Sequence, residues 1–198
     1  MKSFFEFLSE APLLDIKKKS RLNPETGRRF DTDESKKIAS VDKQHDLYHK
    51  PELTMGGRSG MSSYHVVNRE TGKVTSTVYG KRNPKSKSFE VELTDSTGQG
   101  PKAHKVYRKI LQSGHSTSLV GKSHSEGGQK IWQKLSTEKG VSVHGWHRGK
   151  AYNIDPKDPE ETHVSSKEVA QGGLKGDKAG IKTYKMKLVA SLHKRKTV

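Results

Sequence analysis

The sequence predicts a mixed α/β (α+β) domain, in which a mainly antiparallel sheet is flanked by helices. Three observations carry this prediction. Residues 62–94 alternate between apolar and polar side chains and are rich in β-branched residues, as consecutive strands are. Residues 101–135 contain two segments with apolar side chains at helical spacing. Residues 180–190 return to the alternating pattern of a strand.

Three strands are expected first, at residues 63–68, 73–79 and 88–94. Short turns separate them, at residues 69–72 and 80–85, and each turn contains a glycine. Because short glycine-containing turns reverse the chain, these strands should pair as an antiparallel meander.

Two helices and two short strands are expected next. The first helix should span residues 101–113, where Pro101 suits the first turn because its missing N–H is no loss there. The second helix should span residues 126–135, and strands are expected at 116–120 and 141–146. Helical spacing predicts that the two helices bury Ala103, Tyr107, Ile110, Leu111, Ile131, Trp132 and Leu135.

Two stretches are expected to lie outside this core. Residues 11–61 are charged and interrupted by glycine and proline, which favours a linker with a short helix around residues 35–48. Residues 148–180 are polar and rich in turn residues, so we expect an excursion within a folded domain that spans 62–198.

The composition restricts the classes of partner. Lys and Arg number 38 against 22 Asp and Glu, and the formal charge of +16 is spread along 198 residues. This balance suits a protein that lies beside packaged DNA or docks on an acidic partner. The absence of cysteine excludes disulfides and thiolate chemistry. No apolar run is long enough to cross a bilayer, so no membrane partner is expected.

The N-terminal segment is predicted to form a short amphipathic helix. Phe4, Phe5 and Leu8 fall on one helical face, and Glu6 falls on the other. A helix this short is unstable alone in water and would fold on a partner groove. Because Glu6 interrupts the apolar stretch, a secretory signal is a poor fit.

The same segment ends in Leu8-Ser9-Glu10, the only Leu/Ile-x-Glu triplet of the chain, and the small residue Ala11 follows. It resembles the capsid-targeting peptide of the internal head proteins of T-even-type phages, which the head-maturation protease cuts after the Glu of such a triplet. The resemblance implies a propeptide at residues 1–10 that contacts the head scaffold or protease and is removed after Glu10. It further implies a location inside the phage head and then, after injection with the DNA, in the host cytoplasm, acting on an unknown host protein.

From residue 62 to residue 190, the order of the expected elements resembles the GNAT acetyltransferase family. That family holds the pyrophosphate of coenzyme A on a Gln/Arg-x-x-Gly-x-Gly/Ala loop and the N-terminus of the helix that follows. Gly98-Gln99-Gly100 matches the glycine pair of this loop. The resemblance implies acetyl-CoA as the cofactor and assigns its binding to Gly98, Gln99, Gly100, Lys102 and Ala103.

Two positions depart from the family's pattern. Asp95 stands three residues before Gly98, where the family has Gln or Arg, and its negative charge is unhelpful to a pyrophosphate. Trp132 lies near the place where the family often has a Tyr that protonates the leaving thiolate, and an indole cannot act as that acid. These departures favour, as an alternative, a domain that binds and inhibits a host factor without catalysis.

A second glycine-containing loop opens the helix at residues 126–135. In a GNAT arrangement it would lie where the acyl acceptor binds, and the attacking amine must lose a proton there. His124 and Glu126 are therefore the candidate general bases. The alternative is that Ser125 simply caps the helix.

Shorter motifs suggest other functions. A Ser-Thr-Ser strand followed by Glu-x-Glu is typical of arginine-directed mono-ADP-ribosyltransferases. The chain has that triplet at 116–118, but its only Glu-x-Glu, at 90–92, precedes the triplet. A basic DNA-associated head component is a further alternative, since it requires only the positive charge.

The region around residue 145 raises two more possibilities. His144 and His147 stand three apart on an expected strand and so point to opposite faces, and we expect no metal site. Trp132 and Trp146, with nearby Lys and Arg, suggest a surface on which nucleic-acid bases stack. Ile131 and Leu135 flank Trp132 at helical spacing, so we expect Trp132 in the core instead.

Overall fold

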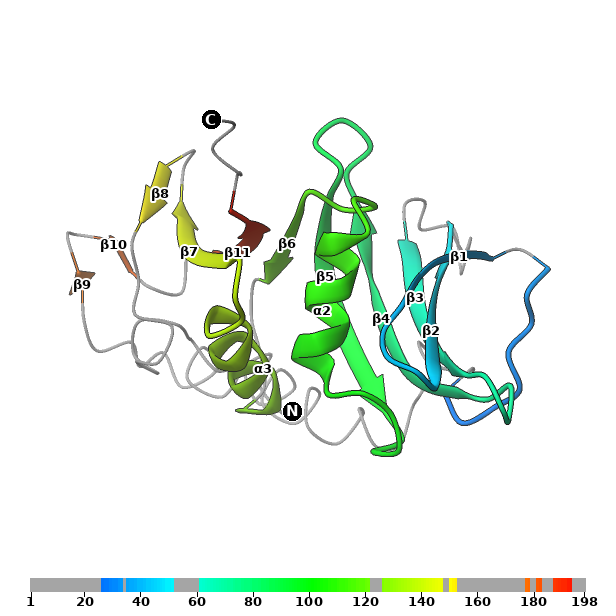
Figure 1. The fold of residues 1–198 in the computed structure, drawn as a ribbon. Coiled ribbons are helices and arrows are strands. Elements are labelled where there is room, and N and C mark those ends of the chain that lie inside the picture. Colours follow the sequence, from blue (N-terminus) through cyan, green and yellow to red (C-terminus); the bar gives the residue numbers. More distant parts are fainter. Residues whose placement is uncertain are drawn as a thin grey trace, which may run out of the picture.

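The structure, a computed structural model, describes residues 26–33, 35–51, 61–121, 126–147, 150–152, 177–178, 181–182 and 187–193. Within these residues, nine strands form one sheet, and two helices lie side by side across it (Figure 1). The strands of the sheet are β1 (Lys36–Ser40), β2 (His45–Lys50), β3 (Met61–Asn68), β4 (Val74–Arg82), β5 (Ser88–Ser96), β6 (Ser118–Gly121), β7 (Val141–His147), β8 (Lys150–Tyr152) and β11 (Lys187–Leu192). The helices are α2 (Ala103–Gln112) and α3 (Glu126–Ser136).

The strand order across the sheet is β1-β2-β3-β4-β5-β6-β11-β7-β8. Neighbouring strands pair antiparallel except for β5 and β6, which pair parallel and are joined through α2. The strand latest in the chain, β11, lies between β6 and β7 and pairs antiparallel with both. The expected mixed α+β class, with a mainly antiparallel sheet, is confirmed.

The core lies between the sheet and the two helices. Tyr64 of β3 and Phe89 of β5 are fully buried, and their rings meet edge to face at 4.8 Å. Ile110 of α2 and Trp132 of α3 belong to the same apolar cluster. Trp132 is 1% exposed, so the expectation that it packs in the core is confirmed. None of the described helices is sufficiently long and apolar to span a membrane.

The expected helix around residues 35–48 is wrong. Residues 36–50 form β1 and β2, which extend the sheet beyond β3. The reversal between them is an Asx turn, in which Oδ1 of Asp42 accepts the N–H groups of Gln44 (2.8 Å) and His45 (2.9 Å). This part of the expected linker 11–61 therefore belongs to the folded sheet.

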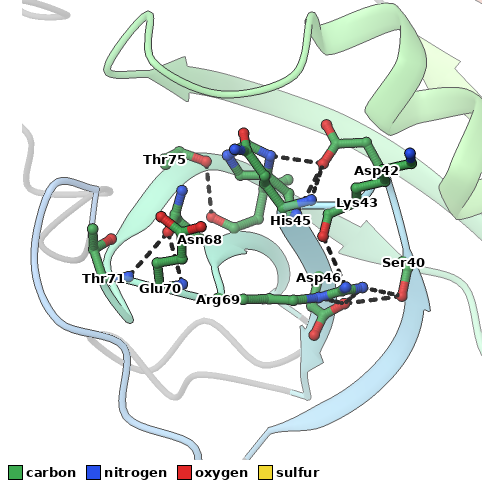
Figure 2. Close-up of polar contacts among 12 residues, drawn as sticks. Ser40, Asp42, Lys43, His45, Asp46, Asn68, Arg69, Glu70, Thr71 and Thr75 are labelled. Atoms are coloured by element: carbon green, nitrogen blue, oxygen red, sulfur yellow. Dashed lines mark hydrogen bonds and ion pairs between the residues drawn. The ribbon is translucent and has the colours of Figure 1, made fainter.

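An ion network ties these two strands to the end of β3 (Figure 2). Asp46 accepts hydrogen bonds at Oδ1 from Nε (3.0 Å) and Nη2 (2.7 Å) of Arg69, and Lys37 Nζ lies 2.7 Å from its Oδ2. Burial by itself would raise the pKa of Asp46, but the hydrogen bonds from Arg69, Lys37 and Ser40 outweigh burial and lower that pKa to about 2. Asp46 and Arg69 are 23 positions apart in the chain, so no local sequence pattern predicts this contact.

Two smaller differences concern the helix and the last strand. In α2, His104 and Val106 are buried with Tyr107, Ile110 and Leu111, whereas Ala103 is half-buried. The strand expected over 180–190 is divided. Its start forms β10 (Ile181–Lys182), which pairs with β9 (Asp177–Lys178), and β11 begins only at Lys187. The expected N-terminal helix and most of the 148–180 excursion lie outside the described residues.

Candidate functional site

The residues predicted to hold a cofactor lie together in the connection from β5 to α2. Gly98 has a φ of +80°, a backbone conformation that favours glycine. The N–H of Gly98 donates to Oγ of Ser96 (3.1 Å), and the N–H of Gln99 donates to Oγ1 of Thr97 (3.3 Å). The turn is thus preformed by its own hydroxyl groups and is exposed to solvent.

The two glycines of this turn are required for different reasons. A Cβ on Gly98 would meet no atom within 4 Å, so only its backbone conformation calls for glycine. A Cβ on Gly100 would lie 2.5 Å from Oγ1 and 2.8 Å from Cβ of Thr75 on β4. Contact with the neighbouring strand therefore accounts for Gly100 without a ligand.

The first turn of α2 is electrically suited to an anion. The first N–H groups of a helix have no carbonyl partner within the helix. In α2, the carbonyl oxygen of Lys102 accepts from Lys105 N (2.9 Å) and Val106 N (3.3 Å), so these two N–H groups are paired. The preceding N–H groups, those of Ala103 and His104, point out of the helix start. No acidic residue lies in this turn, and no side chain caps it. The helix dipole and Lys102 add positive potential at the same place.

Asp95, the predicted obstacle to an anion, lies half-buried near the end of β5. Its Oδ1 accepts the N–H of Ser96 at 2.9 Å, and its backbone oxygen accepts the hydroxyl of Ser76 at 3.0 Å. The carboxylate therefore bonds to its own strand.

Strands β5 and β6 pair over only part of the length of β5. Their parallel pairing joins Ser88–Val91 to Ser118–Gly121, whereas β5 continues to Ser96 along β4. On the β4 side the register shifts, because Tyr79 pairs with Leu93 and Gly80 pairs with Val91, which leaves Glu92 as an extra residue in β5. The second half of β5 thus runs past the described end of β6, on the side where α2 begins.

The predicted general bases are only partly covered by the structure. His124 lies outside the described residues. Glu126 is the first residue of α3, and its side chain is also outside the description. Their predicted role stays a prediction.

A hollow that the sequence did not predict lies on the other face of the sheet, with a volume of about 810 Å³. Its strand residues alternate with residues buried under the helices, for example Ser88 and Glu90 on either side of Phe89. The hollow is lined by Lys81, Arg82, Asn83, Pro84, Ser86, Ser88, Glu90, Thr117, Ser118, Val120, His144, Trp146, Lys187 and Val189. None of the predicted cofactor-binding residues is among them.

The hollow contains both charge signs and one exposed aromatic ring. Trp146 is 40% exposed and stands 6.2 Å, centroid to centroid, from the ring of His144. Burial lowers the pKa of His144. Lys187 Nζ lies 4.0 Å from Glu90 Oε2, so part of the positive charge is balanced within the hollow. The sequence signal for this hollow is the set of polar residues at alternate positions of β5, β6, β7 and β11, which face away from the helices.

Comparison with known proteins assigns no family. No protein-family model matches the chain, and no curated protein matches it. Function must therefore be inferred from the residues and their geometry.

The Ser116-Thr117-Ser118 triplet has structural contacts. The buried hydroxyl of Ser116 lies 2.8 Å from the hydroxyl of Tyr64, and Thr117 Oγ1 donates to Ser86 O at 2.7 Å. Ser118 starts β6 and lines the hollow. These bonds join the segment just before β6 to β3 and to the turn before β5, so the first two hydroxyls of the triplet have structural partners.

Metal ligation finds no support in the part of the chain that is described. No group of three or more His, Asp or Glu side chains there is placed to hold an ion. His144 faces the hollow beside Trp146, and the side chain of His147 is not described.

Proposed function

We propose that this chain is an internal head protein of a phage, whose folded part is a GNAT-like domain that binds an acyl-coenzyme A and acts on a host factor. One observation carries the domain assignment. A single parallel strand pair, β5 and β6, interrupts an otherwise antiparallel sheet, and its connection is a glycine turn leading into α2.

The strand order supports the same assignment. Strands β2 to β5 pair antiparallel in chain order, and β5 is then the first strand of the parallel pair. β11 inserts between β6 and β7 after both helices. This order is similar to that of the GNAT core. The partial pairing of β5 with β6 leaves the far half of β5 beside the start of α2, where a ligand that spans strand and helix would lie.

The chemistry of the turn fits a pyrophosphate. The N–H groups of Ala103 and His104 and the ammonium of Lys102 would hold the phosphate oxygens, aided by the helix dipole. Coenzyme A, when bound, supplies the thioester from which an acyl group is transferred. His124 and Glu126 are proposed to accept the proton of the attacking amine.

A thermal-shift titration with acetyl-CoA tests the coenzyme assignment. A ligand that binds only the folded state raises the melting temperature as its concentration exceeds Kd. Lys102→Glu should weaken this shift, whereas Lys139→Glu makes the same charge change in the exposed turn after α3 and should leave the shift in place. No shift with the unmodified protein at millimolar acetyl-CoA would refute coenzyme binding.

A second candidate, inhibition of a host factor without catalysis, is favoured by Asp95. Asp95 stands three residues before Gly98, where the GNAT pattern has Gln or Arg, and its negative charge disfavours a pyrophosphate. This candidate predicts that acetyl-CoA and desulfo-coenzyme A both fail to stabilise the protein.

The proposed delivery in the phage head has its own test. Mass spectrometry of purified virions should find this polypeptide with Ala11 as its first residue. Glu10→Gln should yield particles in which the polypeptide keeps residues 1–10, while Glu6→Gln should be trimmed normally. Absence from virions, or an uncut N-terminus in the unmodified protein, would contradict the proposal.

A further inference from the structure

We propose that the outer face of the two helices is a binding surface for the phosphate backbone of duplex DNA. This basic face consists of Lys102, Lys105, Lys109, Lys130, Lys134 and Lys139. The inference rests on the proposed packaging of the protein beside DNA. It does not require coenzyme binding, although Lys102 belongs to both proposed sites.

The basic face is formed by helical spacing. In α2, the buried residues Tyr107 and Leu111 face the sheet, so Lys105 and Lys109 project on the opposite side. In α3, Trp132 is buried, and Lys130 projects away from it with Lys134 one turn later.

The two helices share this face because they pack against each other (Figure 1). The rings of Tyr107 and Trp132 meet edge to face at 6.1 Å, and Arg108 Nη1 lies 2.7 Å from Oε2 of Glu138, just beyond α3. The lysine rows of the two helices therefore project from one surface.

The charge of the basic face is not neutralised by the described residues. None of the six lysines forms an ion pair there, and the nearby carboxylate, Glu138, is already engaged by Arg108 and by His104 at 3.4 Å. On the rest of the described surface several lysines do have such partners. These pairs are Lys37 with Asp46, Lys81 with Glu92 and Lys187 with Glu90.

The spacing of the lysines suits the dimensions of DNA. Lys102 and Lys109 are seven residues apart, which corresponds to about 10 Å along a helix. Packed helix axes lie about 8–10 Å apart. The face therefore spans a width comparable to the major groove, which is about 12 Å across. Flexible lysine ammonium groups contact phosphates as point charges without reading bases, so we expect little sequence preference.

The test compares two variants of the full chain that carry the same net charge. One replaces Lys105, Lys109, Lys130 and Lys134 with Gln, and the other replaces Lys43, Lys73, Lys85 and Lys87, four exposed lysines in the sheet turns, with Gln. Each substitution set lowers the formal charge from +16 to +12, since four positive charges are removed. Binding to a short duplex of mixed sequence is measured by fluorescence anisotropy over a range of salt concentrations.

The unmodified protein should bind with an affinity that falls linearly with salt on logarithmic axes. Removing four phosphate contacts should reduce that slope by up to about 3.6, because each contact contributes about 0.9. The turn variant should keep a slope close to that of the unmodified protein. Circular dichroism and thermal melts confirm that both variants fold.

Three results would overturn the assignment: no binding of the duplex at low salt, equal loss in the two variants, or equally tight binding of polyglutamate or anionic lipid vesicles. An absent acetyl-CoA shift together with localised DNA binding would reject the coenzyme and leave this surface standing.

Discussion

Among single residues, the two glycines in the turn between β5 and α2 are required for different reasons. Gly98 provides a positive φ in open space, and Gly100 allows the chain to approach Thr75 on β4. The sequence motif contains both glycines and does not distinguish them. Only the neighbouring strand reveals that one of them is required by packing.

This difference predicts that the same substitution destabilises the protein far more at one glycine than at the other. Gly98→Asn should change the free energy of unfolding little, because Asn tolerates the left-handed region. Gly100→Asn should cost about 1–3 kcal/mol, because its Cβ overlaps Thr75 and the crowded chain must shift. Urea denaturation measures both. Equal stabilities would show that Thr75 moves away easily and that Gly100 is free for another role.

At the scale of elements, a buried hydrogen bond fastens α2 to β5. The hydroxyl of Tyr107 lies 2.6 Å from Oγ1 of Thr94, and the Tyr107 side chain is 3% exposed. Burial, opposed by the Thr94 hydrogen bond, raises the pKa of Tyr107 to about 12. The phenol thus stays neutral and donates or accepts without carrying charge.

Tyr107→Phe should destabilise the protein by about 1–2 kcal/mol, because it leaves the Thr94 hydroxyl without this partner. Thr94→Val should have a similar effect, and the double variant should lose less than the sum of the two. Tyr48→Phe is the control, since the Tyr48 hydroxyl makes no hydrogen bond among the described residues. If the two destabilisations simply add in the double variant, the hydrogen bond between Tyr107 and Thr94 does not stabilise the packing of α2 on β5.

At the scale of the whole molecule, buried histidines make the folded sheet sensitive to moderate acid. His49 of β2 and His65 of β3 are 6% and 0% exposed. Burial lowers both pKa values to about 3, with further repulsion from His115 and Arg82 at His49 and from Lys50 and His49 at His65. The folded state therefore keeps both imidazoles neutral at pH values where the unfolded chain binds protons.

The sign of the pH dependence follows from these lowered pKa values. The stabilisation is complete above the unfolded value of 6.5 and is lost as the pH falls from there toward about 3. Each histidine should contribute a loss on the order of 1 kcal/mol per pH unit in this window. Asp46 stabilises the folded state above its ordinary pKa of 3.8, and this stabilisation is lost only as the pH falls from there toward about 2. Urea denaturation between pH 6.5 and 4.5 therefore reports mainly the histidines.

His49→Phe should flatten this slope, whereas His193→Phe, at an exposed position, should not change it. An unchanged slope in His49→Phe would mean that the imidazole becomes protonated within the folded protein.

The elements whose patterns are local could be predicted from the sequence. Alternation located β3, β4 and β5, and helical spacing located α2 and α3 with most of their buried residues, because burial of one face imposes a period on the chain. The glycine turn before α2 was also predictable, since positive φ selects glycine.

Features that depend on residues far apart in the chain became visible only in the folded structure. β1 and β2 extend the sheet by pairing onto β3, where Asp46 of β2 contacts Arg69 just beyond β3. β11 lies between β6 and β7 through pairing with both. The hollow arises from alternate positions on several strands, and the basic face arises because α2 and α3 pack side by side. Such contacts are set by long-range pairing and by the shared burial of apolar surface, which no period within a single segment encodes.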